Sequence, residues 1–356
     1  MGPSWRSRGL EAAAKLTGLT FDIPPQPQNP QPFVEAFRGI GFRVRVIGAR
    51  DEDGDGDGGN KKRATAIRPN LGAAKAWIAH LDLLKYVVAA GFETAFIVED
   101  DVDFDVRIKA QMRLVSENVR EYTRGDASLS SPPSSLDYDD SDEDGEEDED
   151  GGDNKDNKDN MDNMDDGTPF GTVWDVLWLG HCGAEIDDDS VKQPLSYADP
   201  TRCPADLYVG WWTANLEAHV PAGHRVVQDA GPRTVCTFGY GVTRRSAQKI
   251  LVALGGGAHE AFDVLLAARC REGSLRCLVV NPQLFQHYEP LVAAGAGDGI
   301  AQGSNRSTSL VRVGNGEDTR ADEAVFEARP GSTANIVLSA RCQALFGTPC
   351  LRGPKR

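Results

Sequence analysis

The chain has 356 residues, 40% of them hydrophobic, which is enough to bury a sizeable core in one large α/β domain or two modest ones. Its formal net charge is −16, but residues 136–166 hold 17 acidic residues and 2 lysines, so the remainder has 37 acidic against 36 basic residues. A nearly neutral remainder does not indicate nucleic-acid binding. No run of about 18 apolar residues predicts a transmembrane helix, and the N-terminus lacks an apolar segment of the signal-peptide type.

Two helices and a strand are predicted in the first quarter of the chain. Residues 7–18 form a short predicted helix, and residues 42–47 alternate in polarity as a strand does. The Gly/Asp-rich segment from Asp51 imitates half of a calcium loop, but Lys62 stands where that loop requires a bidentate Glu. A solvated loop is therefore the better interpretation. Residues 71–91 carry apolar side chains at helical spacing.

The most informative local pattern is an apolar strand followed directly by several acidic residues. Residues 94–98 (TAFIV) are followed at once by Glu99, Asp100, Asp101, Asp103 and Asp105, and a second helix is predicted at 106–124. The order helix, strand, acids, helix places the carboxylates at the carboxyl end of a strand. Open α/β sheets bind their ligands at that edge.

The segment after this predicted helix has a different kind of sequence. Residues 125–168 have almost no apolar content and contain DNK and DNM repeats, which predicts a disordered acidic insertion in a surface loop. Strands then alternate with helices at 173–180, 235–242, 244–254, 261–270 and 276–280. This alternation predicts one α/β domain, residues 1–345, with a mostly parallel sheet flanked by helices, and a tail at 346–356.

Seven cysteines are spread over the chain, and none forms a CxxC pair, which argues against a structural zinc site. An odd count fits free buried thiols about as well as a few disulfides, so the sequence leaves this question open. Asn305, Arg306 and Ser307 form a glycosylation sequon, which matters only in a secreted chain.

Carboxylates crowded at one strand end repel one another unless a cation lies among them. Mg²⁺ and Mn²⁺ prefer oxygen ligands and commonly bridge carboxylates to substrate phosphates. Asp101 and Asp103 lie on one side of an extended segment, which makes them the natural ligand pair, and Asp100 could reach a ribose, or the metal through water. The alternative is an acidic loop that caps the following helix. The local pattern does not decide between the two.

A second chemistry uses a similar motif. Phosphotransferases of the haloacid-dehalogenase type have DxDx(T/V) after an apolar strand, and the first Asp is the nucleophile. Here Asp105 stands where Thr or Val belongs, and the motif lies about 100 residues into the chain rather than on a first strand. These departures make the phosphotransferase the weaker candidate.

Seven segments together resemble glycosyltransferase family 25, which includes lipopolysaccharide and collagen galactosyltransferases, and in particular its fungal members. They are LGAAKAWIAHLDLLKYVV, ETAFIVEDDVDFD, WDVLWLGHCG, VCTFGYGVTRRSAQKIL, AFDVLLAARC, NPQLFQHYEP and TANIVLSAR, in the family's order over most of residues 70–341. The resemblance implies a GT-A-like, Rossmann-related fold and a place in the secretory pathway. It implies transfer of a sugar, typically galactose from UDP-galactose, to a glycan or glycoprotein acceptor with inversion.

Matching positions imply where the donor would bind. Glu99, Asp100 and Asp101 fall on the family's EDD motif, with Asp103 beside it, and His80 matches a histidine of the preceding helix. The resemblance implies that this region holds Mn²⁺ (or Mg²⁺) and the nucleotide diphosphate. We therefore assign His80, Glu99 and Asp100 to the UDP-sugar. We assign Asp101 and Asp103 to the metal.

Further candidates lie later in the chain. Inversion needs a carboxylate base near the acceptor hydroxyl, and Asp263, at the start of a predicted helix, is the candidate. An ordinary acid in the first turn of a helix is the alternative role. His287 follows a strand and is a candidate metal or phosphate ligand, although a lone histidine is more often structural. Trp211 and Trp212 lie in a loop-like region and are candidates for an acceptor platform.

The sequence departs from the family at its start. Family members begin with an apolar strand and an arginine-containing turn that help to hold the nucleotide, whereas this chain begins with a segment that resembles the next helix. We expect Arg6 and Arg8 to be the remnant of that turn, the first strand to be missing, and nucleotide binding to be impaired. A non-catalytic relative that binds partners through its acidic insertion is therefore the alternative function.

Overall fold

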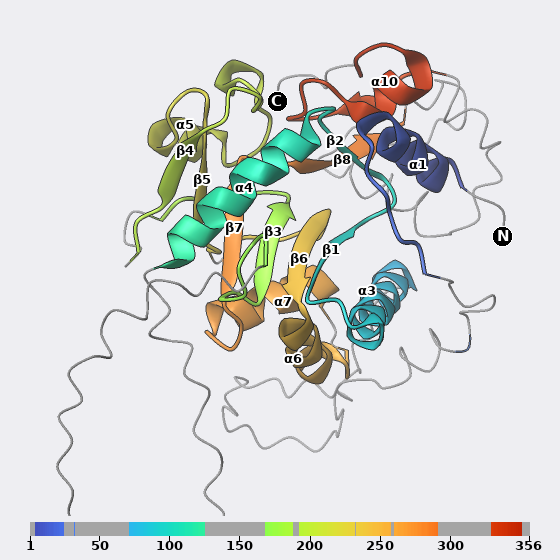
Figure 1. Ribbon diagram of the computed structural model, residues 1–356, viewed down its shortest axis with the longest axis vertical. Coiled ribbons are helices and arrows are strands. Elements are labelled where there is room, and N and C mark those ends of the chain that lie inside the picture. Colours follow the sequence, from blue (N-terminus) through green and yellow to red (C-terminus); the bar gives the residue numbers. More distant parts are fainter. Residues whose placement is uncertain are drawn as a thin grey trace, which may run out of the picture.

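The computed structural model describes residues 4–24, 32, 71–124, 168–187, 192–231, 233–257, 260–290 and 329–350. The predicted strand at 42–47, the Gly/Asp loop after Asp51, all but the last residue of the acidic insertion at 125–168, and the sequon lie outside the described residues. The described part is mixed α/β, with two sheets and helices around them (Figure 1).

The larger sheet has six strands in the order β1-β6-β3-β7-β5-β4. Their bounds are β1 Thr94–Val98, β3 Val176–Gly180, β4 Leu195–Ala198, β5 His224–Asp229, β6 Gly239–Thr243 and β7 Cys277–Asn281. Only β3 and β7 pair in parallel; the other four pairings are antiparallel. The prediction of a mostly parallel sheet is therefore not confirmed. A strand buried on both faces has the same apolar pattern in either direction, so its sequence does not record its direction.

Four of these strands nevertheless share one direction. Since β1 and β3 both pair antiparallel with β6, they run parallel to each other, and β3 runs parallel to β7. Strand β4 has the same direction, because β4 and β7 both pair antiparallel with β5. The carboxyl ends of β1, β3, β4 and β7 therefore lie at the same edge of the sheet. The predicted acidic segment follows β1 at this edge.

The smaller sheet has the order β2-β8-β9 and is antiparallel. It comprises β2 Val102–Phe104, β8 Phe285–Glu289 and β9 Ser332–Thr333. Because β2 follows β1 after three residues and β8 follows β7 after three residues, the two sheets meet where the acidic segment lies (Figure 1). The C-terminal segment contributes the third strand.

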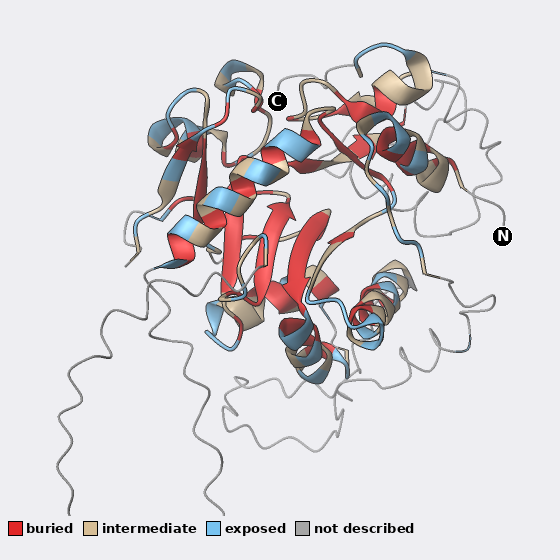
Figure 2. Ribbon diagram, in the orientation of Figure 1, coloured by how far each residue is buried: buried red, intermediate tan, exposed pale blue. Residues whose placement is uncertain are grey.

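Helices cover both faces of the larger sheet. They are α1 Trp5–Thr17, α3 Leu71–Ala90, α4 Ile108–Thr123, α5 Thr213–His219, α6 Arg244–Leu254, α7 Phe262–Arg271 and α10 Ala340–Phe346, with a 3-10 turn η2 at Ala205–Leu207. Side chains of β3 alternate between two cores: Trp178 packs with α3, α6 and α7, whereas Leu177 packs with α4 and α1. Figure 2 shows these strands buried between the two layers. None of the described helices is long and apolar enough to cross a membrane.

The structure answers the open cysteine question for all seven residues. Disulfides join Cys182 with Cys236, Cys270 with Cys277, and Cys342 with Cys350. Cys203 is a buried free thiol. The third disulfide ties residue 350, within the predicted tail, to helix α10.

Candidate functional site

The candidate site lies at the junction of the two sheets, where the chain leaves β1 and enters β2. Residues 99–101 connect the strands, and we call them the acidic loop. The peptide N–H of Tyr288 in β8 donates to the carbonyl of Asp101 at 2.9 Å, and the N–H of Glu99 donates to the carbonyl of Phe238 at 3.2 Å. The loop is thus fixed to both sheets by its backbone.

Asp101 is 2% exposed, and its two carboxylate oxygens differ sharply. Its Oδ2 lies 2.5 Å from Nη2 of Arg6 and 2.7 Å from Nε2 of His287. Its Oδ1 is buried and has no hydrogen-bond partner among the described residues. Burial alone would raise the pKa of Asp101, but the charges and hydrogen bonds of His287 and Arg6 outweigh it and lower this pKa to about 2.

His287 lies opposite Val102 in the β2–β8 pairing, and its ring stacks on Phe238 with centroids 5.5 Å apart. Burial disfavours its charged form, but the adjacent Asp101 carboxylate outweighs that effect and raises the pKa of His287. The sequence-predicted His287 and Asp101 are therefore brought together. In the described structure, they form an ion pair when the imidazole is protonated.

Asp100 points outward, with a side chain that is 51% exposed. Its Oδ1 accepts a hydrogen bond from Nη1 of Arg6 at 2.9 Å. Partial loss of water around the carboxyl raises the pKa of Asp100, and the charge of Arg6 opposes that rise. Arg6, in the first turn of α1, therefore pairs with two neighbouring carboxylates at once. The sequence placed Arg6 near the nucleotide but did not predict these ion pairs.

A series of hydrogen-bonded side chains leads from Glu99 into the core. Oγ1 of Thr237 donates to Oε1 of Glu99 at 3.0 Å and lies 3.2 Å from Nε2 of His80. Nδ1 of His80 lies 3.1 Å from the hydroxyl of Tyr240. Since Thr237 has one proton, the consistent assignment has His80 donating to Thr237 and accepting from Tyr240. His80 is thus held as a neutral, hydrogen-bonded ring.

The pKa values of His80 and Glu99 agree with this assignment of the hydrogen bonds. Burial lowers the pKa of His80 to about 4, so the ring is neutral at pH 7. The ring also stacks on Phe262 with centroids 4.5 Å apart. Burial, followed by the charge of Asp101, raises the pKa of Glu99 to about 7. The loop therefore holds one carboxyl that stays ionised and one that gains or loses its proton near neutral pH.

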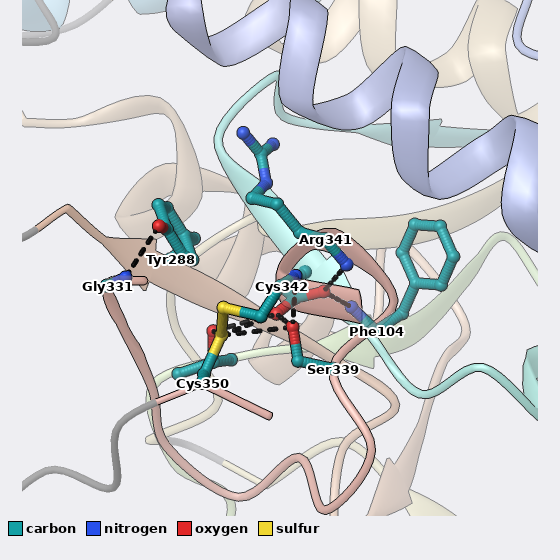
Figure 3. The surroundings of a disulfide bond; sticks show 9 residues. Phe104, Tyr288, Gly331, Ser339, Arg341, Cys342 and Cys350 are labelled. Carbon is teal, nitrogen blue, oxygen red and sulfur yellow. Dashed lines mark hydrogen bonds between the residues drawn. A yellow bond between two sulfur atoms is a disulfide. The ribbon is translucent and has the colours of Figure 1, made fainter. Parts of the chain in front are cut away.

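Asp103 has a different environment from Asp101. Its Oδ1 accepts from the peptide N–H of Phe104 at 2.8 Å and of Arg341 at 3.0 Å. Its Oδ2 accepts from the hydroxyl of Thr333 at 2.8 Å and from the hydroxyl of Ser339. Figure 3 shows three of these donor residues, Phe104, Ser339 and Arg341, beside the Cys342–Cys350 disulfide. Asp103 was predicted to bind the metal, but both of its carboxylate oxygens accept hydrogen bonds from the protein itself.

Three other predicted residues have no contact with the Asp101 cluster in the described structure. Asp263, in the first turn of α7, accepts at Oδ2 from the peptide N–H of Cys236 at 2.8 Å. This bond holds a residue with a positive φ of 68°, next to Thr237. Trp211 is 51% exposed, whereas Trp212 is buried. Of the two predicted platform residues, only Trp211 presents its ring to solvent.

The acidic loop offers oxygen ligands to a divalent cation. Oδ1 of Asp101, which has no partner among the described residues, and the exposed carboxylate of Asp100 are ligands of the type that Mn²⁺ and Mg²⁺ prefer. Among the described residues, no three His, Cys, Asp or Glu side chains form a ready metal-binding group. These metals commonly use one or two carboxylates together with substrate phosphates, so the loop fits a metal that arrives with its substrate.

Sequence reasoning missed two residues of this site. Thr237 lies in the loop before β6, and only the tertiary structure brings it to Glu99. Arg341 lies 241 residues after Asp100 in the chain, yet its guanidinium donates to the Asp100 carbonyl. Their positions in the segments VCTFGYGV and TANIVLSAR were the available signals, because both segments had been singled out.

The fold and the site define a mixed α/β protein with a carboxylate cluster at the carboxyl end of a strand. No protein-family model, no curated protein and no solved structure matches this chain. The functional argument therefore rests on the residues of the site.

Proposed function

We propose that this chain is a metal-dependent glycosyltransferase that moves a sugar, galactose in the first instance, from a UDP-sugar to a glycan or glycoprotein hydroxyl. The observation that carries the proposal is the buried Oδ1 of Asp101. This carboxylate oxygen has no partner in the described ranges and lies at the strand edge where α/β sheets bind ligands. The shared direction of β1, β3 and β7 at this edge supports a GT-A-like arrangement.

In this proposal, Asp101 and Asp100 hold Mn²⁺ or Mg²⁺ together with the donor diphosphate. The metal, when bound, would neutralise negative charge on the departing UDP. His287 keeps Asp101 oriented and ionised through the bond to its Oδ2. Arg6 contributes a positive charge beside both carboxylates. Asp103 supports the adjacent strand, and its proposed place as a direct ligand requires exchange of its present donors.

The remaining predicted residues take supporting roles in the proposal. Glu99, fixed by Thr237 and His80, lies next to the metal ligands and faces the nucleotide-sugar. Asp263 is the proposed base for the acceptor hydroxyl. Only its Oδ2 accepts a hydrogen bond within the described residues, which leaves Oδ1 for a substrate proton.

Calorimetric titration with UDP-galactose and UDP-glucose, with Mn²⁺ and with EDTA, tests the proposal. We expect donor binding that requires Mn²⁺ and that weakens about 10-fold to 100-fold in Asp101→Asn. Asp105→Asn is the matched control, since Asp105 is a buried acid of the same segment that pairs with Arg107. Tight UDP binding unaffected by the chelator would count strongly against the proposal. Binding of a protein partner that is lost when residues 126–166 are deleted would favour the non-catalytic alternative.

A further inference from the structure

Within the described part of the chain, Arg341 is a buried cation with no counter-ion in direct contact. Its side chain is 0% exposed, and no carboxylate of the described residues forms an ion pair with its guanidinium. Burying a charge in this way is costly unless hydrogen bonds replace water. The hydrogen bonds that its guanidinium donates must therefore compensate for the loss of water.

Those partners are three backbone carbonyls around the acidic loop. Nη2 donates to the carbonyl of Asp100 at 2.9 Å and to the carbonyl of Val102 at 3.0 Å. These two carbonyls flank Asp101 on either side. Nη1 donates to the carbonyl of Arg6 at 3.1 Å. A single guanidinium thus holds the backbone on both sides of Asp101 and the residue whose side chain pairs with Asp101.

The backbone of Arg341 adds a fourth link, because its N–H donates to Oδ1 of Asp103 at 3.0 Å. The guanidinium also packs over the ring of Tyr288, with its carbon 5.1 Å from the ring centroid. Figure 3 shows the side chain extending away from the Cys342–Cys350 disulfide, which begins at the next residue of α10. The disulfide ties the first turn of α10 to residue 350, and Arg341 reaches from this turn to the loop.

We propose that Arg341 is the positioning residue of the acidic loop, setting the orientation of the Asp101 carboxylate and of Arg6 beside it. The planar fork of an arginine can reach three acceptors with fixed geometry, whereas a lysine ammonium is a point charge on a flexible stem. Only the consequence for metal affinity rests on the proposed function. The effect on the loop itself does not.

Two variants change this contact by different routes. Arg341→Lys keeps the charge and removes the fork. Gly9→Ala keeps every donor but places a Cβ 2.1 Å from Nη1 of Arg341, so the guanidinium must move. Alanine favours helix more than glycine does, so the second variant does not weaken α1 intrinsically. If Arg341→Lys fails to fold, Gly9→Ala decides the question.

Arg225→Lys is the matched control. Arg225 is also buried, and its guanidinium donates to Asp199 at 2.6 Å and to the carbonyl of Gln283 at 2.9 Å, away from the acidic loop. Its replacement should cost stability without changing the loop. A general loss of packing would affect both arginine sites alike.

Hydrogen exchange followed by mass spectrometry measures the loop directly. We expect exchange in peptides covering residues 99–104 to rise about tenfold in Arg341→Lys and Gly9→Ala, and to stay at the wild-type rate in Arg225→Lys. We also expect Mn²⁺ affinity, measured from the free-ion electron-paramagnetic-resonance signal, to fall about tenfold in the first two variants only. Folded variants with unchanged exchange in the loop would overturn the inference. If exchange responds but the wild type binds no Mn²⁺, the inference stands and the proposed function fails.

Discussion

Asp101 and Asp103 lie two residues apart in one acidic segment and are both buried, yet they have opposite surroundings. Asp103 accepts four hydrogen bonds from neutral donors, three of them in the C-terminal segment. Two side chains contact one oxygen of Asp101, and its other oxygen has no partner in the part of the chain that the structure describes. A carboxylate whose oxygens are all engaged holds the fold together, whereas one with an unused oxygen keeps the capacity to bind a ligand.

The contrast between Asp101 and Asp103 should be largest in the free energy of unfolding. Asp103→Ala removes the acceptor for four buried donors, and we expect it to lower the free energy of unfolding by about 3–5 kcal/mol. Asp101→Ala should cost about 1–3 kcal/mol, because fewer buried groups lose a partner. Urea unfolding of both variants, with Mn²⁺ removed by chelator, gives the comparison. A larger loss for Asp101→Ala would reverse the roles assigned to the two acids.

The raised pKa of Glu99 should make the free energy of unfolding depend on pH. Because its pKa in the folded protein is raised to about 7 from 4.5, the protonated form is favoured by folding. Its contribution to stability is therefore fully present below pH 4.5 and lost as the pH rises through 7. We expect Glu99→Gln to be about 1–3 kcal/mol more stable than the wild type at pH 8, and this difference to vanish below pH 4.5.

Glu11→Gln is the control for that experiment, since Glu11 lies exposed on α1. Unfolding should be measured with chelator present, so that only the ionisation of the carboxyl contributes. Equal stability of Glu99→Gln and the wild type at pH 8 would show that the loop does not disfavour the ionised carboxylate.

Ser339→Ala isolates one bond of the Asp103 network. Ser339 donates to Asp103 and also caps α10 by accepting from the N–H of Cys342. We expect a loss of about 1–2 kcal/mol in the free energy of unfolding, with Mn²⁺ affinity unchanged. Thr243→Ala removes the corresponding cap of α6 and has no bond to Asp103. If the two variants lose the same stability, the bond to Asp103 adds nothing.

Of these variants, Arg6→Gln should have the smallest effect. It changes the affinity of the acidic loop for a metal ion. Arg6 competes with any divalent cation for the carboxylates of Asp100 and Asp101. Removing its charge should tighten binding of Mn²⁺ alone by about threefold to tenfold. Calorimetry should compare it with Arg8→Gln, which removes the same charge from the same helix. Weaker Mn²⁺ binding in Arg6→Gln would show that Arg6 supports the metal site instead.

Several elements could be predicted from local sequence because their signals are local. The helix at 7–18 is found as α1, closed by Gly18 in a left-handed conformation, and the helix at 71–91 is found as α3. The strand at 94–98 is β1 within the same bounds. Apolar spacing and a terminal glycine are enough to specify such elements, because they depend on residues only a few positions apart.

The candidate site could be predicted only in part. The cluster of Glu99, Asp100 and Asp101 was evident from the sequence. His287 was predicted to follow a strand, whereas it lies within β8, and its contact with Asp101 was not predicted. The engagement of Asp103 by Ser339 could not be foreseen, because 235 residues separate the two in the chain before folding joins them. The same holds for Arg6, whose two ion pairs span 94 and 95 positions.

The sequence by itself determined that a strand would end in carboxylates at the edge of an α/β sheet, because apolar and acidic residues are adjacent in the chain. Only the tertiary structure decided the direction of the neighbouring strands and which residues contact each carboxylate. It also decided which carboxylate oxygen has no partner among the described residues. Hydrogen-bond partners from α1, β8 and α10 meet at the acidic loop through folding, and the chemistry of each acid depends on those partners more than on its own identity.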